Sequence, residues 1–435
     1  MNDNEHNRDG LSRRSFLGSG GLAALAAGSM ACSGLASAAA ALGARQHHAG
    51  GTATADIEPF YGVHQNGIIT SQQKYSMFAA FELVDGARRS DLIALLKNWT
   101  RAAASMSRGG TAAPLADNPD AAPADGGSAL GLAPARLTLT FGFGPTLFSR
   151  DGVDRFGLAA RRPAALVDLP RFNGDQLIAE RCGGDLSVQA CADDPQVTFH
   201  AIRQLLSLAD GVATIKWAQN GFSSAPVDGG TGRNLMGFKD GTMNPPTSDP
   251  KTMDQVVWAG AEGGWMKNGS YVVARRIRIA LEHWDKTVQG FQEEVVGRSK
   301  ISGAPIGSRH ESDPLKLAAQ DKDGNPLIPA NSHARLSSPE ENDGAQILRR
   351  AYSYNDGVGF YAERWPPWRQ GMMLDAGLFF IAYQRDPRSG FIRINKKLST
   401  LDSMNQYTTH VGSAIFACPP GAQAGTFIGA GLFEG

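Results

Sequence analysis

The feature that most constrains the fold is an order of strand and helix patterns that occurs twice along the chain. The first copy predicts strands at 75–83, 137–141, 185–191 and 212–217, and helices at 90–99 and 195–206. The second copy predicts strands at 271–280, 347–354, 378–384 and 413–417, and helices at 284–296 and 392–404. Alternating or continuous apolar runs indicate the strands, and apolar residues at helical spacing indicate the helices. Each copy has the β-α-β-β-α-β order of the ferredoxin-like fold, which predicts an α+β protein with two ferredoxin-like domains.

The length of 435 residues agrees with two domains of ordinary size. We expect an N-terminal domain at 59–225 and a C-terminal domain at 226–435. A segment rich in Gly, Ala, Pro and Asp at 108–134 is interpreted as a surface insertion in the first domain. Residues 39–58 are interpreted as a low-complexity spacer that precedes the folded part.

The first 38 residues have the features of an export signal rather than of a folded domain. Ser12-Arg13-Arg14-Ser15-Phe16-Leu17 is a twin-arginine string, and a weakly hydrophobic stretch follows it. Ala36-Ser37-Ala38 has the A-x-A pattern of a cleavage site. We therefore predict a twin-arginine signal peptide at 1–38 and a periplasmic or extracellular protein. Cys32 leaves a lipoprotein acceptor open as a minor alternative.

Composition argues against several kinds of partner and site. The formal net charge is +0, so nothing favours nucleic acid or another polyanion as a partner. No apolar run approaches the roughly 20 residues that cross a bilayer, and we expect a soluble mature protein. No C-x-x-C pair occurs, which makes a thiolate metal site improbable. Cys191 ends a predicted strand and is expected to be a buried thiol, although a disulfide between Cys182 and Cys191 stays open.

Three residues far apart in the sequence are candidates for chemistry. Asp240 lies next to a glycine in Gly237-Phe238-Lys239-Asp240-Gly241, so a tight turn can direct its carboxylate. His333 and Arg349 lie much further along the chain. A carboxylate can take up and return a proton, and an arginine stays charged throughout a reaction. Taken alone, Asp240 could be an ordinary turn residue and His333 an ordinary surface or core histidine. If 347–354 is a strand, Arg350 should point away from the face of Arg349.

The longer string from Gly232 to Pro245 resembles the GxxDG motif of the dye-decolorizing peroxidase family over its whole length. The segment from Asn331 to Pro339 resembles the part of that family that carries the axial haem ligand. The twin-arginine leader and the strings GFKDGT and LRR-x-YSY make the chain most similar to the exported deferrochelatase/peroxidase branch. The resemblance extends from Phe60 to the C-terminus.

The resemblance implies one haem b per chain, bound mainly by the C-terminal domain. His333 would be the axial ligand of the iron, because a haem iron needs only one protein nitrogen and its other face stays open to peroxide. Asp240 would move a proton between the peroxide oxygens, and Arg349 would stabilise negative charge on the departing oxygen. Gly241 and Phe379 would contact the haem.

Each of the further candidates also has a purely structural alternative, and for Asp386 that alternative is the favoured one. Arg233 and Arg335 could bind the haem propionates, or they could be ordinary surface arginines. Asp386 could accept a hydrogen bond from the far nitrogen of His333, or it could be a turn residue before Pro387. Phe379 could belong to the haem pocket or to the core alone.

Two functions of different classes follow from this interpretation. The first is a haem peroxidase that reduces hydrogen peroxide and oxidises dyes, phenols or similar donors one electron at a time. The second is a haem-handling protein of the deferrochelatase type, which releases iron and leaves the tetrapyrrole intact. A non-haem ferredoxin-like binding protein would require every motif match to be accidental. The expected partners are hydrogen peroxide and a small-molecule reductant or porphyrin, with no nucleic acid; iron-uptake proteins and a homo-oligomer stay open.

Overall fold

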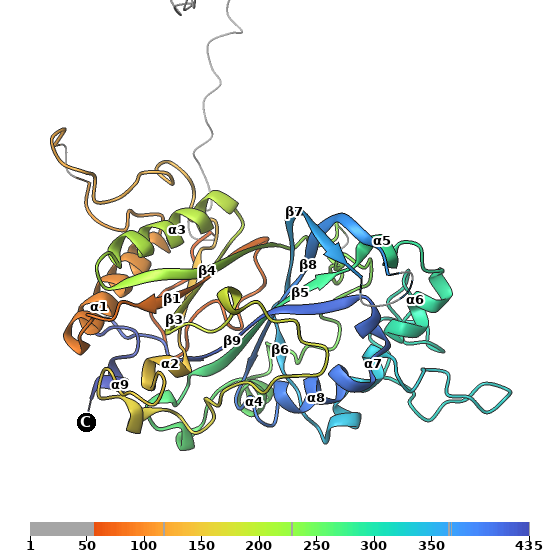
Figure 1. Ribbon diagram of the computed structural model, residues 1–435. Coiled ribbons are helices and arrows are strands. Elements are labelled where there is room, and N and C mark those ends of the chain that lie inside the picture. Colours follow the sequence, from red (N-terminus) through yellow and green to blue (C-terminus); the bar gives the residue numbers. More distant parts are fainter. Residues whose placement is uncertain (1–55, 116–117, 228, 364–365, 367, 435) are drawn as a thin grey trace, which may run out of the picture. The chain divides into compact units, whose positions relative to one another are not determined.

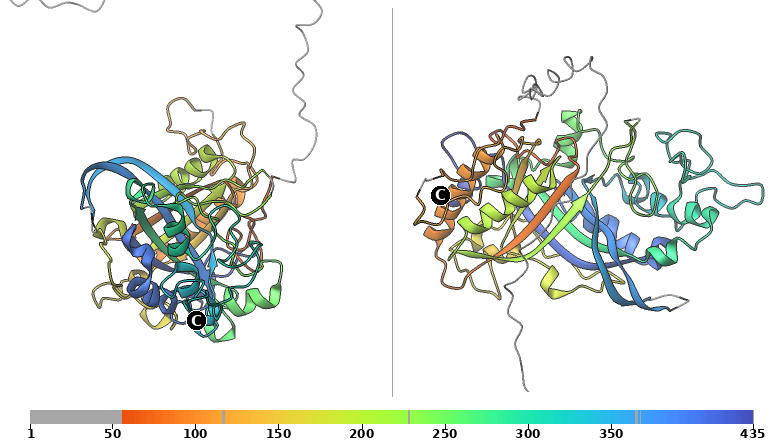
Figure 2. Two further views of the ribbon diagram at one scale, coloured as in Figure 1. Left: turned by 90° about the vertical axis from the view of Figure 1, so that its right-hand side faces the viewer. Right: turned by 90° about the horizontal axis from the view of Figure 1, so that it is seen from above.

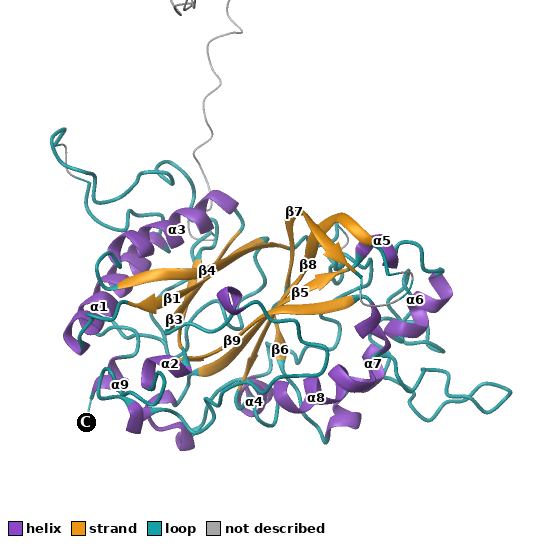
Figure 3. Ribbon diagram, in the orientation of Figure 1, coloured by secondary structure: helices purple, strands orange, loops and turns teal. Residues whose placement is uncertain are grey.

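Strands and helices follow one another nearly in the predicted order (Figures 1 and 3). The computed structural model describes residues 56–115, 118–227, 229–363, 366 and 368–434. The predicted signal peptide and most of the predicted spacer lie outside these residues. The strands are β1 (Tyr75–Leu83), β2 (Thr138–Phe143), β3 (Leu186–Ala192), β4 (Ala213–Phe222), β5 (Ser270–Ile279), β6 (Leu348–Arg349), β7 (Tyr352–Ala362), β8 (Gln370–Gln384) and β9 (Thr408–Cys418).

The helices are of two kinds, α-helices and 3-10 helices. The α-helices are α1 (Arg89–Met106), α2 (Pro145–Phe148), α3 (Pro195–Leu208), α4 (Pro250–Val256), α5 (Leu281–Trp284), α6 (Gln289–Val296), α7 (His333–Leu336), α8 (Phe391–Leu401) and α9 (Ala430–Phe433). Short 3-10 helices are η1 (Ala159–Arg161), η2 (Ala179–Arg181), η3 (Ala261–Met266), η4 (Pro339–Asn342) and η5 (Ser403–Gln406). Over the described ranges, no helix is long and apolar enough to cross a membrane.

The strands of the described residues form one antiparallel sheet in the order β5-β9-β2-β3-β1-β4-β7-β8-β6, and β5 also pairs with β8, which closes it into a barrel. The N-terminal half contributes β2-β3-β1-β4 and the C-terminal half contributes β9-β5-β8-β7. The halves join through two short seams, where Phe143 pairs with Ala417 and Phe222 pairs with Ser353. Helices α1 and α3 lie beside the N-terminal strands, and α7 and α8 lie beside the C-terminal strands (Figures 1 and 2).

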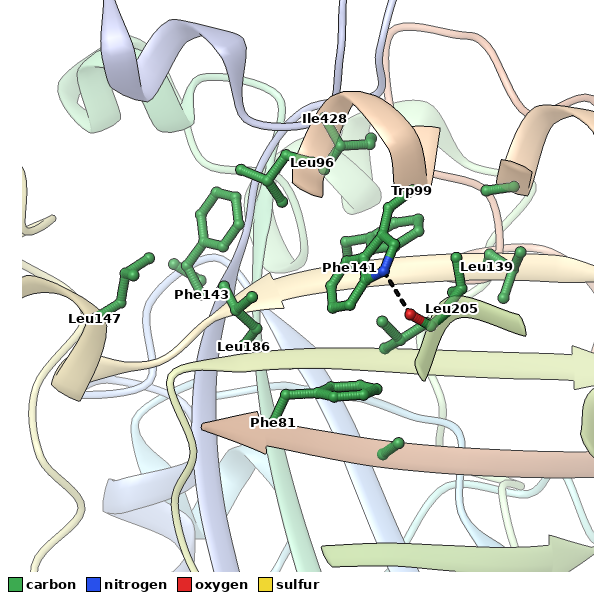
Figure 4. Close-up of a cluster of buried hydrophobic side chains, with 14 of the residues drawn as sticks. Phe81, Leu96, Trp99, Leu139, Phe141, Phe143, Leu147, Leu186, Leu205 and Ile428 are labelled. Atoms are coloured by element: carbon green, nitrogen blue, oxygen red, sulfur yellow. Dashed lines mark hydrogen bonds between the residues drawn. The ribbon is translucent and has the colours of Figure 1, made fainter. Parts of the chain in front are cut away.

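The core has two layers because β1 is buried on both faces, as its continuous apolar run predicts. Phe81 belongs to the cluster that packs under α1 and α3, where the Trp99 indole donates a hydrogen bond of 2.8 Å to the Leu205 carbonyl (Figure 4). Phe78, which points to the other face, packs against Phe379 of β8 in a second cluster shared by both halves. Side chains from both halves of the chain therefore fill the interior of the barrel.

The segment 108–134 contains no helix or strand in its described residues, and buried polar contacts tie it to α3. The Asp125 carboxylate is buried and accepts the Ala112 N–H at 2.7 Å. Ser128 Oγ lies 2.9 Å from Nδ1 of the buried His200 on α3. This region is thus anchored to the N-terminal half rather than loosely attached.

Several predicted boundaries differ from those of the structure. The helix expected at 284–296 is interrupted between α5 and α6, and the strand expected at 347–354 divides into β6 and β7. Strands β7 and β8 extend into a long hairpin, and Asn355-Asp356-Gly357, which has the composition of a turn, lies within β7 where the pairing with β8 shifts register. Cys182 and Cys191 are free thiols, and Cys191 is buried as expected for a strand residue.

Candidate active site

A cavity of about 230 Å³ lies beside the C-terminal strands. One wall consists of residues from β5, β8 and β9, and helices α7 and α8 supply another. The apolar lining includes Ile277, Leu378, Phe380, Ile394 and Leu398. All three principal candidates, Asp240, His333 and Arg349, line this cavity.

Asp240 and Arg349 form an ion pair at the edge of the cavity, although 109 positions separate them. Arg349 Nη1 lies 2.9 Å from Asp240 Oδ1, and both side chains are mostly buried. The loop that carries Asp240 depends on Gly237 and Gly241, whose φ angles of 85° and 108° favour glycine. The Asp240 N–H also donates to the Gly232 carbonyl at 2.9 Å. The carboxylate is therefore held by its own loop and by the arginine.

Two residues that the sequence interpretation missed hold this pair in place. Asn244 spans the Arg349 peptide, since its Oδ1 accepts the Arg349 N–H at 3.0 Å and its Nδ2 donates to the Arg349 carbonyl at 2.7 Å. Glu311 accepts from Lys239 Nζ at 2.5 Å and from Thr242 Oγ1 at 2.8 Å, on either side of Asp240. Burial favours a higher Glu311 pKa, but these hydrogen bonds outweigh it and lower the pKa. Asn244 stands only four residues after Asp240, which is the signal that could have found it.

His333 begins α7 and is held by a buried carboxylate. Its Nδ1 lies 2.6 Å from Asp402 Oδ2, and Asp402 is only 4% exposed. Asp402 begins the turn η5, where Oδ1 accepts the Met404 N–H at 2.8 Å. Burial by itself would lower the pKa of His333, but the negative charge of Asp402 outweighs it and the pKa is raised. With Nδ1–H directed at Asp402, Nε2 is the nitrogen left to bind a metal.

Asp386 does not accept a hydrogen bond from His333, because Asp402 makes that contact. Asp386 Oδ2 instead pairs with Arg388 Nη2 at 2.6 Å, and its carbonyl accepts the Gly390 N–H at 2.9 Å. These contacts belong to the turn before α8, which was the alternative interpretation. Asp402 is the carboxylate that contacts His333 Nδ1, a role that the sequence offered to Asp386.

Neither Arg233 nor Arg335 reaches the cavity. Arg233 donates to the carbonyls of Gly237 and Ile301, each at 2.8 Å. Arg335 donates to the Leu317 carbonyl at 3.0 Å and pairs with Glu341 at 3.2 Å. Both guanidinium groups therefore brace loops, and their placement does not favour the predicted contact with propionates. Arg233 does line a neighbouring cavity of about 480 Å³, which shares Asp240 and Arg349 with the first.

Side-chain alternation in β8 corrects the prediction for Phe379. Phe379 is buried in the barrel against Phe78, with ring centroids 5.6 Å apart. Its neighbour Phe380 lines the cavity instead and packs against Phe391 at 5.7 Å. Arg349, which ends β6, and the next residue, Arg350, point to opposite sides as predicted: Arg349 lines the cavity, whereas Arg350 is buried and donates to Gln73.

The residues around the cavity fit a haem. The apolar wall suits a flat tetrapyrrole, and His333 offers one imidazole nitrogen to its iron. Asn395, which also lines the cavity, is buried and its Nδ2 has no hydrogen-bond partner. Such an unsatisfied amide in a described residue indicates a missing acceptor. A single histidine suffices for haem, where a zinc site would need more ligands.

Models of one protein family match both halves of the chain. The model of the Dyp-type peroxidase N-terminal part matches residues 65–223, and that of the C-terminal part matches residues 231–423. The chain belongs to the Dyp-type peroxidase family. It is a haem-dependent peroxidase of the dye-decolorizing type, which agrees with the resemblance of its motifs.

Relatives in this family include proteins of both predicted functions. The dye-decolorizing peroxidase of Thermobifida fusca is 39% identical over 387 residues, which cover 85% of this chain and 84% of that protein. The deferrochelatase of Escherichia coli K12 is 36% identical, with 87% of each chain covered.

Solved structures of family members agree with the fold. A DyP-type peroxidase from Streptomyces coelicolor is 37% identical with a TM-score of 0.79, and the match covers 89% of this chain and all of that one. DtpA from Streptomyces lividans, solved as an oxyferrous complex, is 37% identical with a TM-score of 0.78, over 88% of this chain and 100% of that one. The two-part α+β fold is therefore that of Dyp-type peroxidases.

Proposed function

We propose that this chain binds one haem b and uses hydrogen peroxide to oxidise dyes, phenols or similar electron donors. In this proposal His333 is the axial ligand, and Asp240 and Arg349 act on peroxide. One observation carries it: a single cavity joins an imidazole held by a buried carboxylate to an aspartate–arginine pair. These groups are an iron ligand, a proton acceptor and a fixed positive charge, which peroxide reduction requires.

The bound haem would supply the iron at which peroxide is reduced. Asp402 keeps Nδ1 of His333 as the donor nitrogen and so leaves the Nε2 lone pair for coordination. Its negative charge also makes the imidazole a stronger electron donor, as carboxylates behind metal-bound histidines do. Asp402 is thus proposed as the positioning residue of the axial ligand.

Asp240 and Arg349 would have different roles in the reaction with peroxide. The Asp240 carboxylate takes a proton from one peroxide oxygen and returns it to the other, so that the leaving group departs as water. Arg349 holds that carboxylate through the 2.9 Å hydrogen bond and supplies positive charge where negative charge develops. Because arginine does not lose its proton near neutral pH, this charge is present throughout.

The second candidate function is release of iron from haem with the tetrapyrrole left intact. It is supported by the 36% identity to the Escherichia coli deferrochelatase. The two functions differ in product: iron release yields a fluorescent free porphyrin, whereas peroxidase turnover consumes peroxide and an electron donor. Iron-uptake partner proteins belong to this second candidate, and a homo-oligomer is compatible with either.

Location and domain boundaries are also part of the proposal. The twin-arginine string at 12–17 and the A-x-A pattern at 36–38 support export to the periplasm or the exterior. The order of elements in each half supports ferredoxin-like domains at 59–225 and 226–435, with haem bound mainly by the second.

The first test is the visible spectrum of the purified mature protein, wild type beside His333→Ala, before and after one equivalent of peroxide. We expect a Soret band in the wild type that responds to peroxide, and a lost or altered band in the variant. A colourless wild-type protein that takes up no added hemin would contradict both candidate functions.

A further inference from the structure

The cavity has a second polar end, on the side away from Arg349. Arg349 lies on β6, whose neighbour is β8, and His410 lies on β9, whose neighbour is β5. Since β8 pairs with β5, two strands separate the two residues. With strands spaced about 4.8 Å apart, this corresponds to roughly 14 Å across the wall of the cavity. Apolar Ile277 and Leu378, which pair with each other, lie between these two ends.

At this second end, Arg275 fixes the orientation and tautomer of His410. Arg275 is 0% exposed and pairs with the Asp175 carboxylate. Its Nε donates to His410 Nδ1 at 3.1 Å, and its Nη1 donates to Ser413 Oγ at 2.9 Å. Because Nδ1 accepts this hydrogen bond, the ring proton must be on Nε2. Burial is the larger cause that lowers the pKa of His410 well below its ordinary value, and the positive charge of Arg275 lowers it further. The ring is therefore neutral. His410 therefore offers one N–H donor to the cavity that it lines.

Asn395 of α8 brings a second donor to the same end. It is 7% exposed, lines the cavity, and its Nδ2 has no hydrogen-bond partner. Phe391 and Ser399 lie one turn before and after it, on the same helix face. The Phe391 ring packs against Phe172 at 5.8 Å, and the Ser399 carbonyl accepts from Asn173 at 3.1 Å. Asn395 therefore faces the segment that carries Asp175, the partner of Arg275.

We propose that Asn395 and His410 together bind a carboxylate at this end of the cavity. The Asn395 Nδ2, which has no hydrogen-bond partner, and the Nε2–H of His410 suit an anionic oxygen, because hydrogen bonds to an ionised group are the stronger ones. Arg275, which lies behind His410, forms an ion pair with Asp175, so the two charges offset each other and the Asp175 carboxylate does not repel a bound carboxylate. The inference rests on the proposed haem site. The carboxylate belongs either to a side chain of the tetrapyrrole or to a separate small acid in the cavity.

The test is the rate at which the holoprotein loses its haem to an excess of apomyoglobin, in the wild type and in Asn395→Leu. Leucine has a similar size and removes the unpaired donor, so we expect the apoprotein of the variant to be at least as stable as the wild type. We expect haem loss to be about tenfold faster in the variant, the effect of one charge-assisted hydrogen bond. His410→Phe should act in the same direction. His200→Gln, which changes a buried histidine outside the cavity, is the control and should leave the rate unchanged.

Loading the protein with hemin dimethyl ester, which has no free carboxylate, separates the two sources. If Asn395→Leu speeds the loss of hemin but not of its ester, the tetrapyrrole supplies the carboxylate. If the variant leaves both rates unchanged but abolishes the shift of the Soret band by benzoate, a separate acid binds there. If neither the rates nor the benzoate response depend on Asn395 or His410, the inference is wrong. A wild-type protein that takes up no hemin would contradict the proposed function instead.

Discussion

The Asp402 carboxylate lies 2.6 Å from Nδ1 of His333, and this contact connects the start of α7 to the turn that follows α8. Asp402 is almost fully buried, so its charge is poorly screened and acts on the imidazole at full strength. Its other oxygen is held by the Met404 N–H, which prevents it from turning away. The orientation of His333 is therefore fixed by a residue that lies between α8 and η5, outside its own helix.

Asp402→Asn should weaken haem retention and peroxidase turnover by about 10–100-fold, the usual effect of removing a carboxylate behind a metal-bound histidine. The amide keeps the shape but has no negative charge, so the pKa of His333 should fall. Stopped-flow turnover and the rate of haem loss measure the effect. Asp386→Asn is the matched control, because Asp386 contacts Arg388 and not His333. Equal losses in both variants would contradict the assignment.

Arg349→Ala should lower peroxide-driven oxidation by about 10²–10³-fold, since it removes the fixed charge at the site of reaction. Haem binding, followed by the Soret band, should persist. The adjacent Arg350 is the comparison: it is buried and bonded to Thr70 and Gln73, outside the cavity. Arg350→Ala should cost about 1–3 kcal/mol of stability, measured by urea unfolding, because it leaves the Thr70 carbonyl and the Gln73 amide oxygen without their donor, with a smaller loss of activity per folded molecule. Full turnover in Arg349→Ala would contradict the proposed role.

Glu311→Gln should loosen the loop around Asp240 in a pH-dependent way. Folding lowers the pKa of Glu311 below the ordinary value of 4.5, so its contribution to stability is present above that value and is lost as pH falls through the lowered pKa. At pH 7 the variant should lose about 1–2 kcal/mol of unfolding free energy and some turnover. The difference from wild type should shrink progressively as the pH falls below 4.5, as urea unfolding over a series of pH values would show. A difference that stays constant with pH would contradict the ion pair with Lys239.

Local pattern predicted much of the fold, and the resemblance to family strings selected Asp240, His333 and Arg349, which line one cavity in the structure. The order of strands and helices follows from apolar spacing, and Asp240, His333 and Arg349 stand in recognisable strings. Asp402 lies 69 positions from His333 in an ordinary turn string, so only the fold reveals their contact. The closure of the barrel, through β5 and β8, is likewise a tertiary event that periodicity does not contain.

The faces of β8 could not be assigned because Leu378-Phe379-Phe380-Ile381-Ala382 is apolar at every position. Alternation carries information only when one face is polar, and both faces of this strand are covered. The apolar run therefore accommodates Phe379 in the haem pocket no better than it accommodates Phe380. The structure decides between them by placing Phe379 against Phe78 and Phe380 against Phe391.

This assignment makes opposite predictions for two adjacent phenylalanines. Phe379→Ala removes a ring that is buried in the barrel, and it should cost about 3–5 kcal/mol of stability while leaving the Soret band in place. Phe380→Ala opens the wall of the cavity, so it should shift the Soret band and speed haem loss to apomyoglobin several-fold, with a smaller cost in stability because its ring is only partly buried. Urea unfolding and visible spectra of the two variants measure both quantities. If Phe379→Ala disturbs the haem and Phe380→Ala does not, the two faces of β8 have been exchanged. In that case Leu378, which shares a face with Phe380, would also leave the cavity wall.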